Sequence, residues 1–316
     1  MRLSIGSRGS KLALWQAHWV RDRLVAAGHE IAIRIIKTTG DKLQNVAPDE
    51  PLAASVAQTV AAAGGKGLFI KEIEEALLAR EVDVAVHSLK DLPVEQPAGL
   101  TLGAVPLRED ARDVFIARDG QPLENLPHGA RVATSSLRRQ TQLRSLRPDL
   151  AYVTIRGNLD TRLRKLARGD CEALVLAAAG VHRLGLGERI TAYFSFDQMC
   201  PAVGQGALGV EIRADDRGAR EAVTPLNHPA THQEVRAERA LLRRLGGGCQ
   251  VPIAAHALWE DGQLRLRGLV ANLDGTRVIR AQAVGSASDP EALGAAVAED
   301  LLRQGAGEIL KALGRM

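Results

Sequence analysis

Short β-branched runs alternate with helix-like segments over the first two thirds of the chain, and this alternation most constrains the fold. The runs 3–6, 31–36 and 82–86 have the length and composition of strands. The segments 11–27 and 68–80, which lie between them, place apolar residues at helical spacing. Such β–α–β units predict parallel sheets with helices on both faces, in which ligands bind beyond the carboxyl ends of the strands.

The same alternation continues to residue 176, and the C-terminal part follows a different pattern. Strands are predicted at 132–133, 152–155 and 173–176, with helices at 137–146 and 159–168. A charged helix is then predicted at 233–245, strands at 253–258, 264–271 and 277–284, and a final helix from an Asp289 cap to about residue 313. The chain thus predicts an α/β fold with a small α+β module built on an antiparallel three-stranded sheet. Residues 43–63 are Ala-rich and predict a mobile loop.

Composition is that of a soluble globular protein. The chain has 316 residues, 46% of them hydrophobic and 25% charged, and it lacks an apolar stretch of the roughly 18 residues that a membrane span needs. Its polar start does not contain the apolar run of a signal peptide. Cys171, Cys200 and Cys249 are too widely spaced for a disulfide framework or a clustered metal site. We therefore expect a cytoplasmic protein without a metal ion.

Positive charge is concentrated in one segment of the chain. The formal net charge is +4, but the 38 residues from Arg131 to Arg168 carry nine Arg and one Lys against Asp149 and Asp160. This segment therefore has a charge of +8, and an anionic partner is expected to meet it. Only Tyr152 among the nine aromatic residues lies within it, so a stacking platform for nucleic acid is not predicted. A small polyanion is therefore a better candidate partner for this segment than nucleic acid.

Polar residues at two predicted strand ends could bind such an anion. Thr134, Ser135 and Ser136 stand between a strand and a helix, where they can cap the helix or bind a carboxylate or phosphate. Arg156 and Arg162 follow another strand. Guanidinium groups from separate strand ends favour a ligand with more than one carboxylate or phosphate.

Three further positions allow both a structural and a functional interpretation. Lys66 lies in a Gly-rich sequence without P-loop spacing, which can be a hinge or can carry the lysine to a ligand. Asp91 can form a surface ion pair with Lys90 or can serve in proton transfer and cation stabilisation. Cys249 follows three glycines and can be a small buried hydrophobe or an accessible thiol.

The chain contains, in this order, SRGSKLALWQA, GGKGLF, AVHSLKDLP, ATSSLRRQ, IRGNLDTRL, AAAGVHRLGL, PAVGQGALG and GGGCQVPI. With these motifs, which are distributed over most of its length, it closely resembles the porphobilinogen deaminase (hydroxymethylbilane synthase) family. The resemblance implies a transferase that joins four porphobilinogen molecules head to tail, with loss of ammonia, into linear hydroxymethylbilane. It also implies a dipyrromethane cofactor held by a thioether to one cysteine, and Cys249 matches that position.

The resemblance assigns further roles residue by residue. Asp91 matches the catalytic aspartate. The cofactor-binding positions are matched by Ser88, Lys90, Asp91, Thr134, Ser135, Ser136, Arg138, Arg139 and Arg162. The substrate-binding positions are matched by Arg8, Ser10, Gln16, Arg156, Arg162, Arg183 and Gln205. Lys66 and Phe69 match the glycine-rich loop near the cleft.

The resemblance also implies three domains. The first two are doubly wound and similar to periplasmic binding proteins, with a cleft between them, and the third carries the cofactor cysteine. Their expected bounds are 1–106 with 206–224, 110–201, and 228–316. The expected partner is porphobilinogen alone, with neither nucleic acid nor membrane, and the expected state is a monomer. The Ala-rich segment before GGKG lacks the acidic and lysine residues expected from the family, which leaves the contacts of that loop open.

A binding protein for a dicarboxylate is the alternative hypothesis, because two doubly wound lobes with an Arg-lined cleft would have a similar sequence pattern. Asp91 and Cys249 discriminate between the two hypotheses, since a binding protein needs no covalent anchor.

Overall fold

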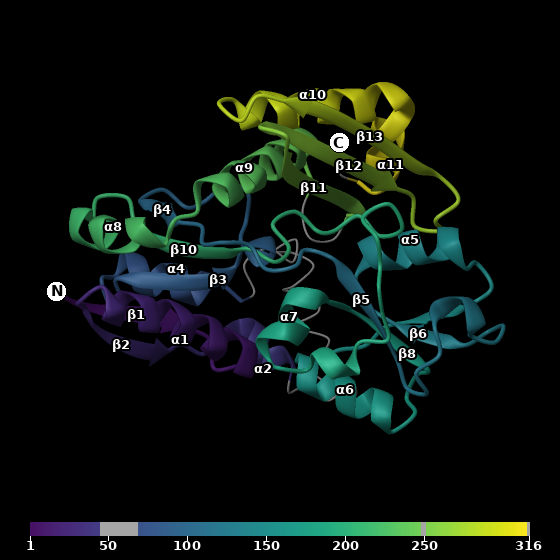
Figure 1. Cartoon of the computed structure of the whole chain (residues 1–316), viewed down its shortest axis with the longest axis horizontal. Coiled ribbons are helices and arrows are strands. Elements are labelled where there is room, and N and C mark those ends of the chain that lie inside the picture. The colour runs from purple at the N-terminus through teal and green to yellow at the C-terminus, as the bar shows by residue number, and fades with distance from the viewer. Residues whose placement is uncertain (45–68, 248–250, 315–316) are drawn as a thin grey trace. The chain divides into compact units, whose positions relative to one another are not determined.

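The computed structural model describes residues 1–44, 69–247 and 251–314 (Figure 1). They form two compact units, the first from Met1–Arg108 with Ala207–His232 and the second from Glu109–Gly206 with Gln233–Met316. Lys66, Cys249 and most of the predicted loop 43–63 lie outside the described residues. No helix within the described ranges has the length and apolar character needed to cross a membrane.

The first unit is built on a five-stranded sheet in the order β2-β1-β3-β10-β4. Its strands are β1 (Arg2–Ser7), β2 (Glu30–Ile35), β3 (Val84–Ser88), β4 (Leu100–Ala104) and β10 (Leu208–Arg213). β1 runs parallel to β2 and β3, as predicted, whereas β10 is antiparallel to both β3 and β4. The predicted parallel pairing is therefore confirmed for β1, β2 and β3, and β10, the strand with which the chain re-enters this unit, is antiparallel to its neighbours.

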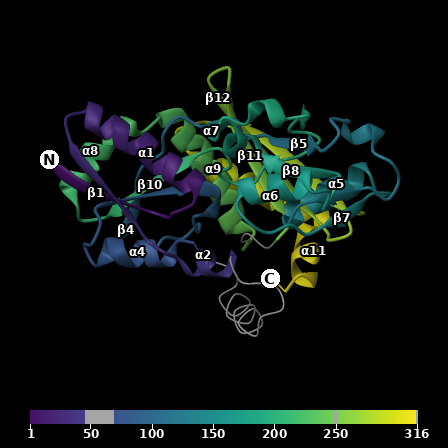
Figure 2. The same cartoon turned by 90° about the horizontal axis from the view of Figure 1, so that it is seen from below.

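Helices cover both faces of this sheet (Figure 2). They are α1 (Lys11–Ala26), α2 (Thr39–Gln44), α4 (Lys71–Leu78) and α8 (Arg217–Val223). α1 and α8 share one apolar cluster with the sheet, and α4 packs in another cluster on the opposite face. The predicted helix start at Ser10 is confirmed, because its hydroxyl accepts a hydrogen bond from Ala13 N at 3.3 Å.

The second unit begins with a sheet of the same kind, in the order β7-β6-β8-β5-β9. Its strands are β5 (Asp113–Ala117), β6 (Arg131–Ala133), β7 (Ala151–Val153), β8 (Ala173–Ala177) and β9 (Ala192–Tyr193). β5 is antiparallel to its neighbours, as β10 is in the first sheet. α5 (Leu137–Leu146) packs on one face, and α6 (Leu159–Ala167) with α7 (Ala178–Arg183) packs on the other. These two mostly parallel sheets confirm the doubly wound fold class.

The C-terminal module has the predicted antiparallel sheet β11-β12-β13. Its elements are β11 (Ile253–Glu260), β12 (Gln263–Ala271), β13 (Val278–Gly285), α9 (Pro229–Arg244), α10 (Pro290–Leu301) and α11 (Gly307–Ala312). The helices share one large apolar core with a single face of this sheet, and Figure 1 shows α10 lying along it. The predicted final helix is wrong in one respect, because it is interrupted at Gly305, where φ is +98°. Short 3-10 turns occur at Leu89–Asp91, Leu123–Asn125, Gly187–Arg189 and Thr224–Leu226.

Candidate active site

In the first unit, the candidate residues gather at the carboxyl end of β3. Ser88 is the last residue of this strand, and a 3-10 turn carries the chain through Lys90 to Asp91. Gln16 is a buried residue of α1, and its amide donates to Ser88 Oγ at 2.9 Å, which joins two predicted site residues. Leu89, in the middle of this turn, is buried, and its packing holds the turn in place. The turn therefore has one buried apolar residue, Leu89, between the polar residues Ser88 and Lys90.

Asp91 is exposed at this strand end. Its carboxylate has no hydrogen-bond or ion-pair partner among the described residues, so the structure shows no ion pair with Lys90 in that part of the chain. An unpaired carboxylate on a turn fixed by a buried strand can accept hydrogen bonds from a ligand and stabilise a developing cation.

Arg8 and Phe69 form a second part of the site in the same unit. The Arg8 guanidinium lies 4.0 Å from the centroid of the Phe69 ring and donates through Nε to Asp41 Oδ1 at 3.0 Å. Thr38 Oγ1 donates to the other oxygen of Asp41 at 2.8 Å. Burial alone would raise the pKa of Asp41, but its bonds to Arg8 and Thr38 outweigh that effect and lower it. Sequence reasoning missed Asp41, which lies 33 residues from its arginine.

In the second unit, the Thr134–Ser136 triplet separates into structural and free hydroxyls. Thr134 is buried, and its Oγ1 accepts from Ser136 N at 3.3 Å. Ser135 Oγ donates to Ile155 O and accepts from Ile155 N at 3.2 Å, which ties β6 to the segment after β7. Ser136 is the N-cap of α5, and its hydroxyl makes no capping bond. The Ser136 hydroxyl is thus the member of the triplet that remains available to a ligand.

Arg138 and Arg139 converge on one carboxylate that sequence reasoning missed. Arg138 Nη1 donates to Asp113 Oδ2 at 2.7 Å, and Arg139 donates to Asp113 Oδ1 through Nε at 2.9 Å and Nη2 at 2.7 Å. Gln205 Nε2 also donates to Asp113 Oδ1, at 3.0 Å. Asp113 is fully buried, and the two arginines are 5% and 6% exposed.

Burial and pairing act against each other in this cluster. Burial would raise the pKa of Asp113, but the charges and hydrogen bonds of Arg138 and Arg139 hold it well below the ordinary value. Burial lowers the pKa of Arg139, and Asp113 offsets part of that effect. The paired geometry thus favours a carboxylate between two guanidinium groups, with one positive charge in excess.

The remaining predicted arginines differ in their surroundings. Arg156 is exposed, and its guanidinium has no partner in the described ranges. Arg162 Nε donates to Gly157 O at 2.8 Å. Arg183 is buried, and its Nη2 donates to Gly206 O at 2.7 Å. Burial lowers the pKa of Arg183 to about 10.

Gly206 ends the segment by which the chain leaves the second unit, and this position requires glycine. Its φ is +87°, and a Cβ built there would overlap the carbonyl oxygen of Glu109. Glu109 N donates to Gly206 O at 3.2 Å, so the outgoing and incoming segments are paired. Gln205 donates to Ala111 O at 2.8 Å and strengthens the same pairing.

The basic segment is more fully paired than its charge suggests. Within the part of the chain that the structure describes, five of its nine arginines form ion pairs with described carboxylates, several of which lie outside the segment. The pairs are Arg131–Glu172, Arg138–Asp113, Arg139–Asp113, Arg147–Asp149 and Arg168–Asp170. Much of the +8 charge therefore serves the fold, and Arg156 is the clearest exposed exception.

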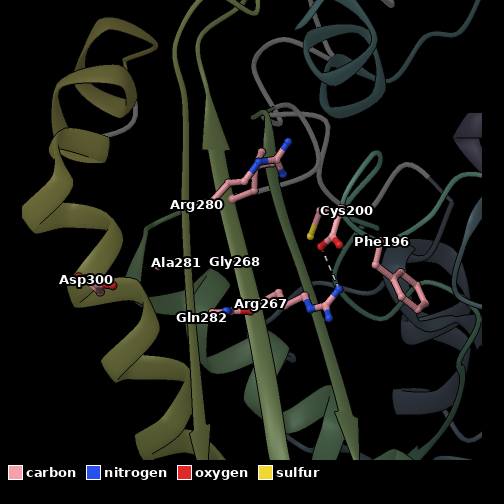
Figure 3. A pocket seen from close by; sticks show the side chains of 10 residues that line it. Phe196, Cys200, Arg267, Gly268, Arg280, Ala281, Gln282 and Asp300 are labelled. Carbon is pink, nitrogen blue, oxygen red and sulfur yellow. Dashed lines mark hydrogen bonds and ion pairs between the residues drawn. The ribbon is translucent and has the colours of Figure 1, made fainter. Parts of the chain in front are cut away.

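A pocket of about 480 Å³ lies at the C-terminal sheet, lined by residues of β12, β13 and α10 and by the segment that contains Phe196 and Cys200 (Figure 3). Phe196, Cys200, Arg267 and Arg280 line it, and Arg267 is paired with Asp197 at 3.1 Å. Cys200 is a buried free thiol, and burial raises its pKa to about 12. Burial therefore disfavours the thiolate, which is the reactive form of a cysteine.

Comparison with known proteins decides the family. The sequence model of the porphobilinogen deaminase dipyrromethane-cofactor-binding domain matches residues 3–221, and that of the porphobilinogen deaminase C-terminal domain matches residues 232–303. The chain belongs to the porphobilinogen deaminase family. Members are transferases that condense porphobilinogen into hydroxymethylbilane on a dipyrromethane cofactor, and this is the activity of the chain. The predicted family, reaction and cofactor are confirmed.

Named porphobilinogen deaminases match nearly the whole chain. The protein of Syntrophobacter fumaroxidans is 49% identical over 99% of this chain and 98% of its own length. That of Geobacter sulfurreducens is 51% identical, with 98% and 94% covered, and that of Desulforudis audaxviator is 53% identical, with 97% and 96% covered. Among solved structures, the methionine binding protein MetQ gives a TM-score of 0.43 at 11% identity, covering 75% of this chain and 93% of that one, a likeness too distant to support an argument.

Proposed function

We propose that Asp91 carries the chemistry of the condensation, and that arginines of both units hold the carboxylates of the cofactor and the substrate. One observation carries this assignment: Asp91 is exposed, has no partner among the described residues, and follows a buried strand that fixes its backbone. Its carboxylate can accept hydrogen bonds from pyrrole N–H groups. It can also stabilise the positive charge that develops as ammonia leaves porphobilinogen.

The donor set of the second unit fits the carboxylates of dipyrromethane. Arg138 and Arg139 bring two positive charges to the single negative charge of Asp113, and the Ser136 hydroxyl makes no capping bond. Acetate and propionate groups are suitable partners for such a site. When bound, dipyrromethane supplies the pyrrole α-carbon that forms the new bond. Cys249 is the proposed thioether anchor.

Arg8 and Arg156 are the proposed contacts for substrate carboxylates. Asp41 and the Phe69 ring orient the Arg8 guanidinium. A guanidinium has five N–H donors, so Arg8 can bind a carboxylate of the substrate while it still pairs with Asp41. The Arg156 guanidinium is exposed and can neutralise a carboxylate directly. Ser10, Gln16, Arg162 and Lys66 complete the proposed substrate side, with Lys90 and Ser88 on the cofactor side. Thr134 and Ser135 border the cofactor side and hold the backbone that carries Ser136.

Arg183 and Gln205 contribute differently in this proposal. Both donate to backbone carbonyls of the segments that connect the two units, Arg183 to Gly206 O and Gln205 to Ala111 O. Their proposed contribution is therefore to hold the connecting backbone in one geometry.

We also propose that the chain works as a cytoplasmic monomer with three domains, at 1–106 with 206–224, 110–201 and 228–316, and that it binds no nucleic acid. The extensive ion pairing of the basic segment supports the last point. The separate apolar core of the C-terminal module supports a third domain. Light scattering that gives the mass of one chain is the expected result, and a dimer mass would contradict the monomer.

Asp91→Ala tests the catalytic assignment, with Asp22→Ala as control because Asp22 is an exposed carboxylate on α1. Asp91→Ala is expected to retain the dipyrromethane adduct by intact mass and to lose nearly all formation of hydroxymethylbilane and ammonia from porphobilinogen. The control is expected to keep both. Substantial turnover by Asp91→Ala would assign the chemistry to another residue, and binding of unchanged porphobilinogen without turnover by the wild type would favour the binding-protein alternative.

A further inference from the structure

We propose that Asp113 is a positioning residue of the dipyrromethane site, because its buried carboxylate fixes the Arg138 and Arg139 guanidinium groups in the orientation that receives the cofactor's carboxylates. This inference rests on the proposed function, in which the two arginines bind the cofactor.

The geometry around Asp113 leaves its carboxylate no freedom. Asp113 is the first residue of β5 and is fully buried. Oδ2 accepts from Arg138, and Oδ1 accepts from Arg139 and Gln205 at distances between 2.7 and 3.0 Å. A carboxylate bound through both oxygens fixes the planes of both guanidinium groups, because each guanidinium donates along fixed directions.

The charges explain why an aspartate is needed here. Arg138 and Arg139 are consecutive residues in the first turn of α5, and both are buried. Two adjacent guanidinium groups in a site of low polarity repel each other and lose hydration. Asp113 compensates one of the two charges, so the chain can fold before the cofactor arrives. One positive charge remains, and a carboxylate of the cofactor can compensate it.

The two arginines have different numbers of donors left. Each nitrogen of Arg139 has an acceptor, since Nε and Nη2 donate to Asp113 and Nη1 donates to Val175 O at 3.1 Å. Arg138 Nη1 donates to both Asp113 and Cys200 O. Arg138 Nε and Nη2 have no partner among the described residues. Of the five N–H donors of a guanidinium, Arg138 therefore has three left for the cofactor and Arg139 has two.

The test is the capture of the cofactor by full-length apoprotein. Asp113→Asn keeps the shape of the side chain and removes its charge, and Asp149→Asn is the matched control because it removes a partly exposed Asp–Arg147 pair in the same unit. Each apoprotein is incubated with porphobilinogen at a temperature where circular dichroism shows it folded, and adduct formation is followed by intact mass. Adduct formation in Asp113→Asn is expected to slow by roughly tenfold or more, in line with the loss of hydrogen bonds between charged groups. The control is expected to keep the wild-type rate.

A folded Asp113→Asn that captures the cofactor at the wild-type rate would overturn the proposal and leave Asp113 with a purely structural role. If Asp113→Asn does not fold, Arg138→Gln decides, because Arg139 still pairs with Asp113 in that variant. Slow capture by Arg138→Gln supports the proposal, and capture at the wild-type rate overturns it. Failure of the wild type to form any adduct would instead count against the proposed function.

Discussion

The buried carboxyl group of Glu74 makes the stability of the first unit depend on pH, and this dependence can be tested. It lies on α4, is only 9% exposed, and its Oε1 has no hydrogen-bond partner within the described part of the chain. Its charged neighbours are Glu211, His87 and Glu75. His87 Nε2 lies 3.2 Å from Glu211 Oε2, and Gln96 donates to Glu211 Oε1 at 2.8 Å, so Glu211 is already satisfied without Glu74.

Burial, together with repulsion from Glu211, raises the pKa of Glu74 from 4.5 to about 7, against a smaller opposing effect of His87. Each pKa unit corresponds to about 1.4 kcal/mol, so the folded state favours protonated Glu74 by about 3 kcal/mol. Because the pKa is raised on folding, this contribution is fully present below the unfolded pKa and is lost as the pH rises through about 7.

Glu74→Gln replaces the carboxyl by a neutral amide of similar shape and removes this pH dependence. Relative to the wild type, its free energy of unfolding is expected to rise by about 3 kcal/mol between about pH 4.5 and about pH 8. Urea unfolding at a series of pH values measures this difference. Glu81→Gln is the control, because Glu81 is an exposed carboxylate that is not among the charged neighbours of Glu74. A stability difference between Glu74→Gln and wild type that does not change with pH would refute the reasoning.

Three other substitutions test separate parts of the structure. Gly206→Ala places a Cβ at a φ of +87° and against a backbone oxygen, so it should lower the free energy of unfolding by roughly 3 kcal/mol. Gly120→Ala has a φ of +71° but open space around the Cβ, and it should lower the free energy of unfolding by roughly 1 kcal/mol. Equal losses for the two variants in thermal unfolding would contradict the effect of the overlap. Arg156→Gln should raise the KM for porphobilinogen and leave stability within about 0.5 kcal/mol, and an unchanged KM would remove Arg156 from the substrate site. Phe69→Leu removes the ring 4.0 Å from the Arg8 guanidinium and should raise KM by a few-fold, corresponding to about 0.5–1 kcal/mol, with kcat unchanged; a loss confined to kcat would argue against an orienting role.

Local sequence signals predicted most of the elements. The helix predicted at 137–146 matches α5 residue for residue, and the caps at Ser10 and Asp289 are both confirmed by side-chain hydrogen bonds. The three C-terminal strands were predicted within two residues at each end. These features depend on neighbours along the chain, so a single sequence contains the information.

The two errors have different physical origins. The break at Gly305 has a local signal, a glycine in the left-handed region, which was not used. Asp113 has no local signal, because it lies in a charged stretch that is typical of an exposed loop. Its burial depends on Arg138, Arg139 and Gln205, which lie 25, 26 and 92 residues away.

The basic segment also contains contacts between residues distant in sequence, which a single sequence does not predict. Its charge predicted an anionic partner, yet Asp113 and Glu172, which pair with three of its arginines, lie outside it. Counting charge along the sequence could not separate the paired arginines from Arg156. Within the candidate site, the resemblance supplied the residue types, and the structure showed which of the described ones are engaged by the fold.

The central claim is that this chain builds hydroxymethylbilane on a dipyrromethane held by Cys249. Intact mass spectrometry of the apoprotein before and after incubation with porphobilinogen tests it most directly, with Cys249→Ser measured in parallel. The wild type is expected to gain the mass of the two-pyrrole cofactor, and Cys249→Ser is expected to keep the bare chain mass. A wild type that stays at the bare mass, or a Cys249→Ser variant that gains the adduct, would contradict the account.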